Sequence, residues 1–160
     1  MKALRYFGER DIRHDSMEDP KLESDRDAIV QMTACSICGS DLHIYHGHGF
    51  SEDTGFCVGH EAVGEVVEVG RAVTRVKVGD KVMMPAAVGC GACRSCLSGV
   101  VNNCENNGSG CYGLSARLQG VQAEAFRVPA ADMNAVKIPE GISEDQALMM
   151  TDAMATAWFG

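Results

Sequence analysis

The sequence predicts a mainly β fold with short helices, and three observations support this prediction. Short segments rich in Val follow one another through the first half of the chain and are bounded by Gly or by polar turn residues. Helical signals are few and short. Four of the eight cysteines fall in one Gly-rich stretch, residues 90–104, which is typical of a loop that closes around a metal ion.

Five segments are expected to form strands, because each combines apolar residues with an alternating or Val-rich pattern. They are residues 2–6, 12–16, 28–34, 62–70 and 123–128, and a turn at 78–80 leads into a further strand that continues to Met84. Three short helices are also expected. One begins near Cys38 and ends at Tyr45, a second follows the capping pair Ser143 and Gln146, and a third begins near Asp152.

Length and charge limit the classes of protein that this chain can represent. We expect a single domain over residues 1–160, because this length suits one domain with its own core. A net charge of −8 excludes a nucleic-acid partner, since phosphate binding needs a basic face. No apolar run is long enough to cross a bilayer and no apolar signal segment follows Met1, so we expect a cytoplasmic protein with no membrane partner. In that compartment cysteines bind metal more often than they form disulfides.

The four clustered cysteines predict a structural zinc site in a lobe at about residues 89–111. Their pattern is Cys90-x2-Cys93-x2-Cys96-x7-Cys104. Four thiolates complete the tetrahedron that zinc prefers and leave no open position, so such a site holds structure and performs no chemistry. An iron–sulfur cluster is the main rival, but its bacterial pattern places the next Cys three residues later with Pro after it. Here the gap is seven residues, and Glu105 follows.

A second group of candidate ligands is weaker on spacing alone. Cys38 lies in Cys-Gly-Ser-Asp-Leu-His, and His60 lies in Gly-His-Glu. A single Cys and a single His are more often ordinary buried residues than metal ligands. Their spacing therefore does not by itself predict a shared metal.

The order of the motifs resembles a known family. Cys-x-x-Cys-Gly-Ser-Asp-x-His at 35–43, Gly-His-Glu at 59–61, Val-Gly-Asp at 78–80 and the four-cysteine pattern occur in the order found in the zinc-dependent alcohol dehydrogenases of the medium-chain family. The resemblance covers nearly the whole chain. It implies the family's N-terminal catalytic domain, a GroES-like, partly open β-barrel that carries the four-cysteine zinc lobe.

The resemblance also implies a catalytic zinc site. It assigns Cys38 and His60 as zinc ligands and Glu61 as a carboxylate that can approach the metal. Asp152 resembles the aspartate ligand of bacterial secondary-alcohol dehydrogenases, some of which lack the four-cysteine lobe. The alternative for Asp152 is a carboxylate that only stabilises a helix start. Cys35 is not a ligand in the family, and a redox Cys-x-x-Cys pair is poorly supported.

Two residues between these ligands are expected to move a proton. Ser40 and His43 are three residues apart on a short helix and therefore share a face. The family uses this pair to carry a proton from the alcohol towards solvent, whereas ordinary surface polarity is the alternative. His46 and His48 lie between glycines and are not assigned as ligands, and Cys57 and Cys111 have no assigned role.

The sequence contains a misleading nucleotide-binding motif. Residues 108–113 match G-x-G-x-x-G, but no apolar strand precedes them and a poor helix follows. A Rossmann nucleotide-binding domain is therefore predicted to be absent from these residues, and NAD or NADP is expected to bind elsewhere in the complete enzyme.

The function implied by the resemblance is interconversion of an alcohol with an aldehyde or ketone by hydride transfer to NAD(P). Two Zn²⁺ ions per chain are expected, one catalytic and one structural, and the complete enzyme is expected to be a homo-oligomer. The chain alone is expected to bind zinc and to lack turnover. The alternative is a non-catalytic, zinc-stabilised GroES-like interaction module, which would hold one ion. A zinc ribbon that binds nucleic acid conflicts with the charge.

Overall fold

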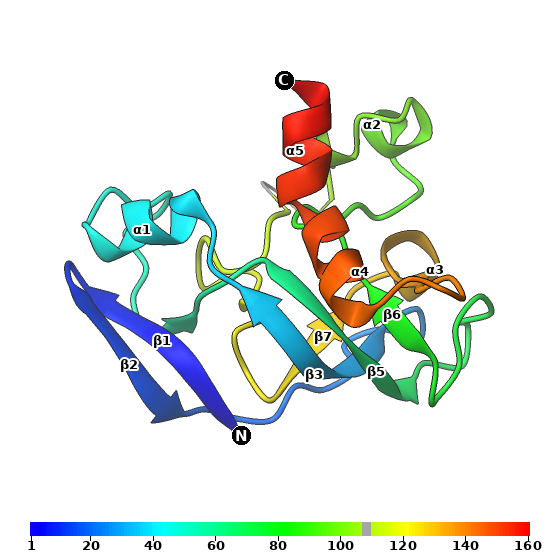
Figure 1. Ribbon diagram of the computed structural model, residues 1–160, viewed down its shortest axis with the longest axis horizontal. Helices are drawn as coiled ribbons and strands as arrows, with labels where there is room; N and C mark the ends of the chain where they lie inside the picture. The colour runs from blue at the N-terminus through cyan, green and yellow to red at the C-terminus, as the bar shows by residue number, and fades with distance from the viewer. Residues whose placement is uncertain (107–109) are drawn as a thin grey trace.

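The computed structural model describes residues 1–106 and 110–160 and contains two sheets (Figure 1). Strand order is β2-β1-β4 in the first sheet and β7-β3-β5-β6-β8 in the second. The strands are β1 (Lys2–Gly8), β2 (Asp11–Ser16), β3 (Ala28–Ser36), β4 (Phe56–Cys57), β5 (Glu61–Val69), β6 (Lys81–Met83), β7 (Ala125–Val128) and β8 (Val136–Lys137). The helices are α1 (Gly39–Tyr45), α2 (Arg94–Leu97), α3 (Ala131–Asn134), α4 (Glu144–Thr151) and α5 (Ala153–Phe159), with a 3₁₀ turn η1 (Val101–Asn103).

Strands β3 and β5 form the centre of the larger sheet. They pair antiparallel from Ala28↔Val69 to Ser36↔Glu61. The strands approach closely at Gly64, where any side chain would overlap the backbone carbonyl of Gln31. Strand β3 ends at Ser36, which pairs with Glu61, the first residue of β5. The segment after β3 and the residue before β5 therefore meet at the same end of the sheet.

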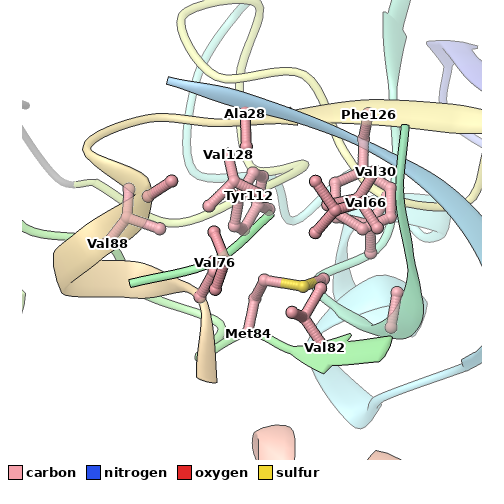
Figure 2. Packing of buried hydrophobic residues seen from close by; sticks show 14 residues of the cluster. Ala28, Val30, Val66, Val76, Val82, Met84, Val88, Tyr112, Phe126 and Val128 are labelled. Carbon is pink, nitrogen blue, oxygen red and sulfur yellow. The ribbon is translucent and has the colours of Figure 1, made fainter. Parts of the chain in front are cut away.

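The main core lies on one face of this sheet (Figure 2). Apolar side chains from β3, β5, β6 and β7 meet Tyr112 and the buried start of α3. Its fully or almost fully buried members include Val30, Val66, Val82, Tyr112, Phe126 and Val128. Each aliphatic side chain of this size contributes about 1.5–3 kcal/mol when removed from water, so this face accounts for the choice of Val in the strands.

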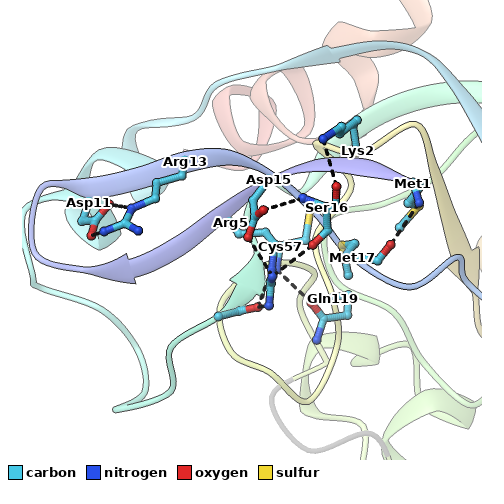
Figure 3. Close-up of polar contacts among 11 residues, drawn as sticks. Met1, Lys2, Arg5, Asp11, Arg13, Asp15, Ser16, Met17, Cys57 and Gln119 are labelled. Carbon is cyan, nitrogen blue, oxygen red and sulfur yellow. Dashed lines mark hydrogen bonds and ion pairs between the residues drawn. The ribbon is translucent and has the colours of Figure 1, made fainter.

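Strand β1 connects the two sheets into a partly open barrel. It pairs with β2 along its length and with β4 near Tyr6. At its other end, Leu4 N donates to Gln122 O at 2.9 Å and Glu124 N donates to Lys2 O at 3.0 Å, which joins β1 to the segment before β7. The side chain of Arg5, on β1, links this strand to its neighbours: its Nη2 donates to Gly55 O at 2.6 Å and its Nη1 to Asp15 Oδ2 at 3.1 Å (Figure 3).

The predicted mainly β, GroES-like fold is confirmed. All six predicted strands and all three predicted helices are present, and the predicted capping box is formed: Ser143 Oγ accepts from Gln146 N at 3.2 Å, and Ser143 N donates to Gln146 Oε1 at 2.9 Å. Sequence reasoning missed five short elements, β4, β8, η1, α2 and α3. Part of the rejected nucleotide motif, Gly108 and Ser109, lies outside the described residues, as does that portion of the predicted lobe. None of the described helices combines the length and apolarity that crossing a membrane requires.

Candidate metal centres

The structure brings the four clustered cysteines together. The four Sγ atoms, of Cys90, Cys93, Cys96 and Cys104, all lie within 4.8 Å of one another. Cys93 caps the short helix α2, Cys96 lies within this helix, and the turn η1 leads directly into Cys104. This is the donor set of a closed tetrahedral zinc site.

Three N–H groups of the lobe donate hydrogen bonds to the sulfur of Cys90. Cys90 Sγ accepts from Ala92 N at 3.4 Å, from Cys93 N at 3.3 Å and from Asn106 Nδ2 at 3.2 Å. These donors, the Ala92 amide first, lower the pKa of the Cys90 thiol to about 6. The Cys96 amide also lowers the pKa of Cys93, whereas burial raises the pKa of Cys96 to about 11. The hydrogen bonds therefore favour the thiolate, the form that binds metal, at Cys90 and Cys93.

An asparagine from another part of the chain holds the base of the lobe. Asn134, at the end of α3, is 1% exposed. Its Oδ1 accepts from Gly89 N at 3.0 Å, and its Nδ2 donates to Gly89 O at 2.8 Å. Arg26 Nη2 also donates to Cys90 O at 3.0 Å. No spacing signal in the sequence links Asn134 to the cysteines, so sequence reasoning missed this contact.

A second cluster forms where three distant segments meet. Ligand atoms of Cys38, His60, Glu61 and Asp152 all lie within 4.8 Å of one another. Cys38 precedes α1, the His60–Glu61 pair begins β5, and Asp152 lies between α4 and α5. Asp152 Oδ2 is 3.6 Å from Cys38 Sγ and 3.6 Å from His60 Nε2. The described structure therefore brings together all the predicted ligands of the open site.

The environment of His60 fits a metal ligand. His60 is 3% exposed, and its Nδ1 lies 3.6 Å from Oδ1 of the buried Asp41. Neither of these two atoms has a hydrogen-bond partner among the described residues. A carboxylate behind one ring nitrogen is the usual way in which a metal-binding histidine is oriented, with the proton held on that side and the other nitrogen left free. Here the free nitrogen is Nε2, which faces Cys38 and Asp152.

Asp41 is a site residue that sequence reasoning did not assign. Its Oδ2 accepts from Cys38 N at 2.9 Å, which is the N-terminal cap of α1. The sequence signal, a carboxylate three residues after a helix start, predicts only this capping bond. The contact with His60 arises from the packing of α1 against the start of β5 and has no local signal.

The predicted proton-relay pair is split between two environments. Ser40 Oγ lies 3.2 Å from His60 Nε2 and 3.3 Å from Cys38 Sγ, so it belongs to the cluster. His43 lies on the exposed surface of α1, and among the described residues it forms no hydrogen bond with Ser40. Glu61 is buried and accepts a hydrogen bond from Ser36 Oγ across the β3–β5 pair.

Cys111 is a further neighbour of the open cluster. Tyr112 N donates to Ala86 O at 3.1 Å, and Ala86 N donates to Thr151 O at 3.3 Å, which ties this segment to the residue before Asp152. On the other side, a Cβ at Gly113 would lie 2.6 Å from the backbone of Gly59, the residue before His60. Burial, followed by the negative charge of Asp152, raises the pKa of the Cys111 thiol to about 12.

The remaining two cysteines, Cys35 and Cys57, belong to neither cluster. Cys57 is fully buried in β4, and burial raises the pKa of its thiol to about 12. Cys35 is exposed on β3. In the described structure neither belongs to a group of ligand atoms that could hold a metal.

Comparison with known families identifies the domain that carries these two clusters. A family model described as the alcohol dehydrogenase GroES-like domain matches residues 24–140. The chain belongs to this family. The matched part of this GroES-like domain includes Cys38, His60 and the four-cysteine lobe and ends before Asp152.

Relatives of this GroES-like domain match almost all of its length. A medium chain reductase/dehydrogenase from an Acremonium species is 44% identical over 100% of this chain and 54% of that protein. A probable zinc-binding alcohol dehydrogenase from Mycobacterium tuberculosis is 43% identical over 99% of this chain and 40% of that protein. The solved structure of an alcohol dehydrogenase from a Thermus species has a TM-score of 0.92 at 34% identity, over 99% of this chain and 46% of that one. The chain thus spans roughly half the length of these relatives.

Proposed function

We propose that residues 1–160 form the GroES-like catalytic domain of a zinc-dependent alcohol dehydrogenase. The observation that carries this proposal is the convergence of Cys38, His60, Glu61 and Asp152 from three segments. Glu61 is held by Ser36, and the other three, a Cys, a His and an Asp, would leave one tetrahedral position open. The unpartnered buried pair behind His60 supports it. Family membership supports the reaction class, because relatives of this chain are zinc-type alcohol dehydrogenases.

The residues around the open site have distinct roles in this proposal. Cys38, His60 and Asp152 would hold zinc, which when bound supplies Lewis-acid catalysis and lowers the pKa of an alcohol oxygen. The Asp41 carboxylate, 3.6 Å from His60 Nδ1, favours a proton on that nitrogen, which would leave Nε2 available to the metal. Glu61, oriented by Ser36, supplies a carboxylate that can replace a ligand during exchange.

A proton leaves the site along α1. Ser40 is placed to accept the alcohol proton, because its hydroxyl lies beside both His60 Nε2 and Cys38 Sγ. His43 is one turn further along the helix and exposed, so it can pass the proton to solvent. NAD or NADP, which would supply the hydride acceptor for the carbinol hydrogen, would bind to a part of the complete enzyme outside these residues.

The four-cysteine lobe has no open position and keeps a structural role in this proposal. The expected content is therefore two zinc ions per chain, one in each cluster. A small alcohol, aldehyde or ketone is the proposed substrate class. A cytoplasmic location and a homo-oligomeric complete enzyme remain part of the proposal.

Metal stoichiometry tests the proposal against a non-catalytic interaction module. The wild-type chain should contain two zinc ions, and Cys38→Ala should lose one while the lobe retains the other. Cys35→Ala is the matched control, since it removes an exposed thiol three residues away and should keep both ions. A wild-type chain with one ion, unchanged by Cys38→Ala, would favour the module and refute the open site.

A further inference from the structure

A hollow on the outer side of α1 gathers three of the chain's five histidines. It has a volume of about 590 Å³, and its lining includes His43, His46, His48 and Glu9. The fourth histidine, His60, belongs to the open metal cluster, and the fifth, His14, lies on β2. Three imidazoles and one carboxylate therefore share a single concave surface outside the two clusters described above.

The backbone fixes the positions of these histidines. His43 and His46 are three residues apart at the end of α1 and therefore lie on one face. Gly47 then adopts a φ of 77°, which reverses the chain. After this turn His48 N donates to His43 O at 2.8 Å, so the backbone of His48 lies beside that of His43, and both residues line the hollow.

A second segment closes the hollow with a carboxylate. Glu9 lies in the hairpin turn between β1 and β2, and its side chain packs so closely on Gly47 that a Cβ there would lie 3.1 Å from Glu9 Cγ. Arg10 N donates to Tyr45 O at 2.6 Å, which attaches the hairpin to α1. The Arg10 guanidinium is 3.9 Å from the Glu9 carboxylate, but both side chains are mostly exposed, so this pair is weak and easily replaced.

We propose that this hollow is a third metal site, which binds a divalent transition metal ion through His43, His46 and His48 with Glu9 as an additional ligand. Nitrogen and oxygen ligands such as imidazole and carboxylate suit Ni²⁺ and Cu²⁺. All four side chains are exposed, and among the described residues none of the three imidazoles forms a hydrogen bond or an ion pair. No three of these ligand atoms lie within 4.8 Å of one another, so the side chains must rotate to share an ion. That rotation breaks no hydrogen bond or ion pair of the three imidazoles with the described residues.

The site has a consequence for catalysis that rests on the proposed function. His43 is both a ligand here and the last group of the proposed proton path. An ion in the hollow would occupy the imidazole that must receive the proton, so excess metal would inhibit the complete enzyme through this site. Binding itself does not depend on that consequence.

Nickel titration of the zinc-loaded chain, produced without a histidine tag, tests the site directly. Isothermal titration calorimetry should show one Ni²⁺ ion bound with micromolar affinity in addition to the two zinc ions. The double variant His46→Ala/His48→Ala should weaken this binding by at least about tenfold, since two of the ligands are lost. His14→Ala is the matched control and should bind Ni²⁺ as the wild type does.

The replaced side chains are exposed, so the double variant should keep the wild-type melting temperature and both zinc ions. Glu9→Gln, which retains size and removes charge, should weaken Ni²⁺ binding by a smaller factor than the double variant. Absence of Ni²⁺ binding to the wild type, or equal binding by the double variant, would overturn the inference. Cys38→Ala separates the two proposals: it should keep the Ni²⁺ site, so retention of both zinc ions in that variant would refute the proposed function alone.

Discussion

The two cysteine-containing clusters are built in opposite ways. The lobe takes its four thiols from a single loop, residues 90–104. The open cluster takes its ligands from three segments, with Cys38 and Asp152 separated by 114 residues. The first can be organised by local turns, whereas the second exists only when β3, β5 and α4 have packed. A closed site is thus encoded by spacing, and an open site is encoded by the fold.

Removal of a lobe ligand should have the largest effect. Cys96→Ala should empty the lobe and lower the melting temperature of the zinc-loaded chain by about 10 °C or more, because structural zinc contributes several kcal/mol to folding. Cys38→Ala should lose one ion with a smaller decrease, since the segments around it are held by the sheet. Differential scanning calorimetry gives the melting temperature of both variants, and metal analysis gives their zinc content. A larger decrease in melting temperature for Cys38→Ala than for Cys96→Ala would contradict the structural role of the lobe.

Replacement of Gly113, whose backbone lies against that of Gly59 beside His60, should have the next largest effect. Gly113→Ala should cost about 2–4 kcal/mol, because Gly113 has a φ of 65° and an added Cβ would overlap the backbone of Gly59. Gly99→Ala is the matched control in the lobe: its φ is 83°, but an added Cβ would meet no atom within 4 Å, so only about 1–2 kcal/mol of backbone strain is expected. Urea unfolding of both variants gives the difference, and equal costs would show that the approach to Gly59 is unimportant.

Replacement of Asp41, the carboxylate behind His60, should weaken zinc binding at the open cluster and leave zinc binding at the lobe unchanged. Asp41→Asn should weaken zinc binding at the open cluster by about 10–100-fold, as is typical when the partner of a metal-binding histidine is changed. Its amide oxygen can still accept from Cys38 N, so the cap of α1 is preserved. Competition with a chromophoric chelator should resolve two zinc affinities, and only the affinity of the open cluster should change. A loss of zinc from the lobe would contradict this assignment.

The thiols of the two regions should differ in their response to pH when metal is absent. The pKa of Cys90 is lowered from an ordinary 9.0 to about 6, chiefly by the Ala92 amide, so its thiolate persists until the pH falls through about 6. The corresponding contribution to the stability of the metal-free lobe decreases as the pH falls from 9 to 6. Cys111, with a pKa of about 12, remains a neutral thiol over this range. Iodoacetamide labelling followed by mass spectrometry should modify Cys90 at pH 7 and leave Cys111 intact.

The sequence predicted the fold well because its strands carry a regular apolar pattern. The predicted alternation of residues 28–34 is present: Ala28 and Val30 enter the main core, whereas Ile29 and Gln31 line one hollow on the other face. One detail shows the limit. The pairing of β5 with β3 skips Val67, which is a bulge in β5. A bulge of this kind depends on the neighbouring strand, and the Val-rich pattern of β5 does not mark it.

The candidate sites were predictable to different degrees. The lobe cysteines followed from spacing, and the open-site ligands followed only from the family resemblance. Asp41, Asn134 and Cys111 were missed, because each acts on residues at least 19 positions away through tertiary packing. Local motifs report turns and caps, and they carry no information on which segments later become neighbours.

The contact between Asn134 and Gly89 also sets an order of assembly during synthesis. The lobe has all its thiols once Cys104 has left the ribosome, but its base cannot dock until Asn134 emerges 30 residues later. At about 5–20 residues per second this interval is about 1.5–6 s. During that time a nascent chain can already hold zinc in an undocked lobe. The ion would then be acquired before the barrel closes, and the docking of α3 would fix it in place afterwards.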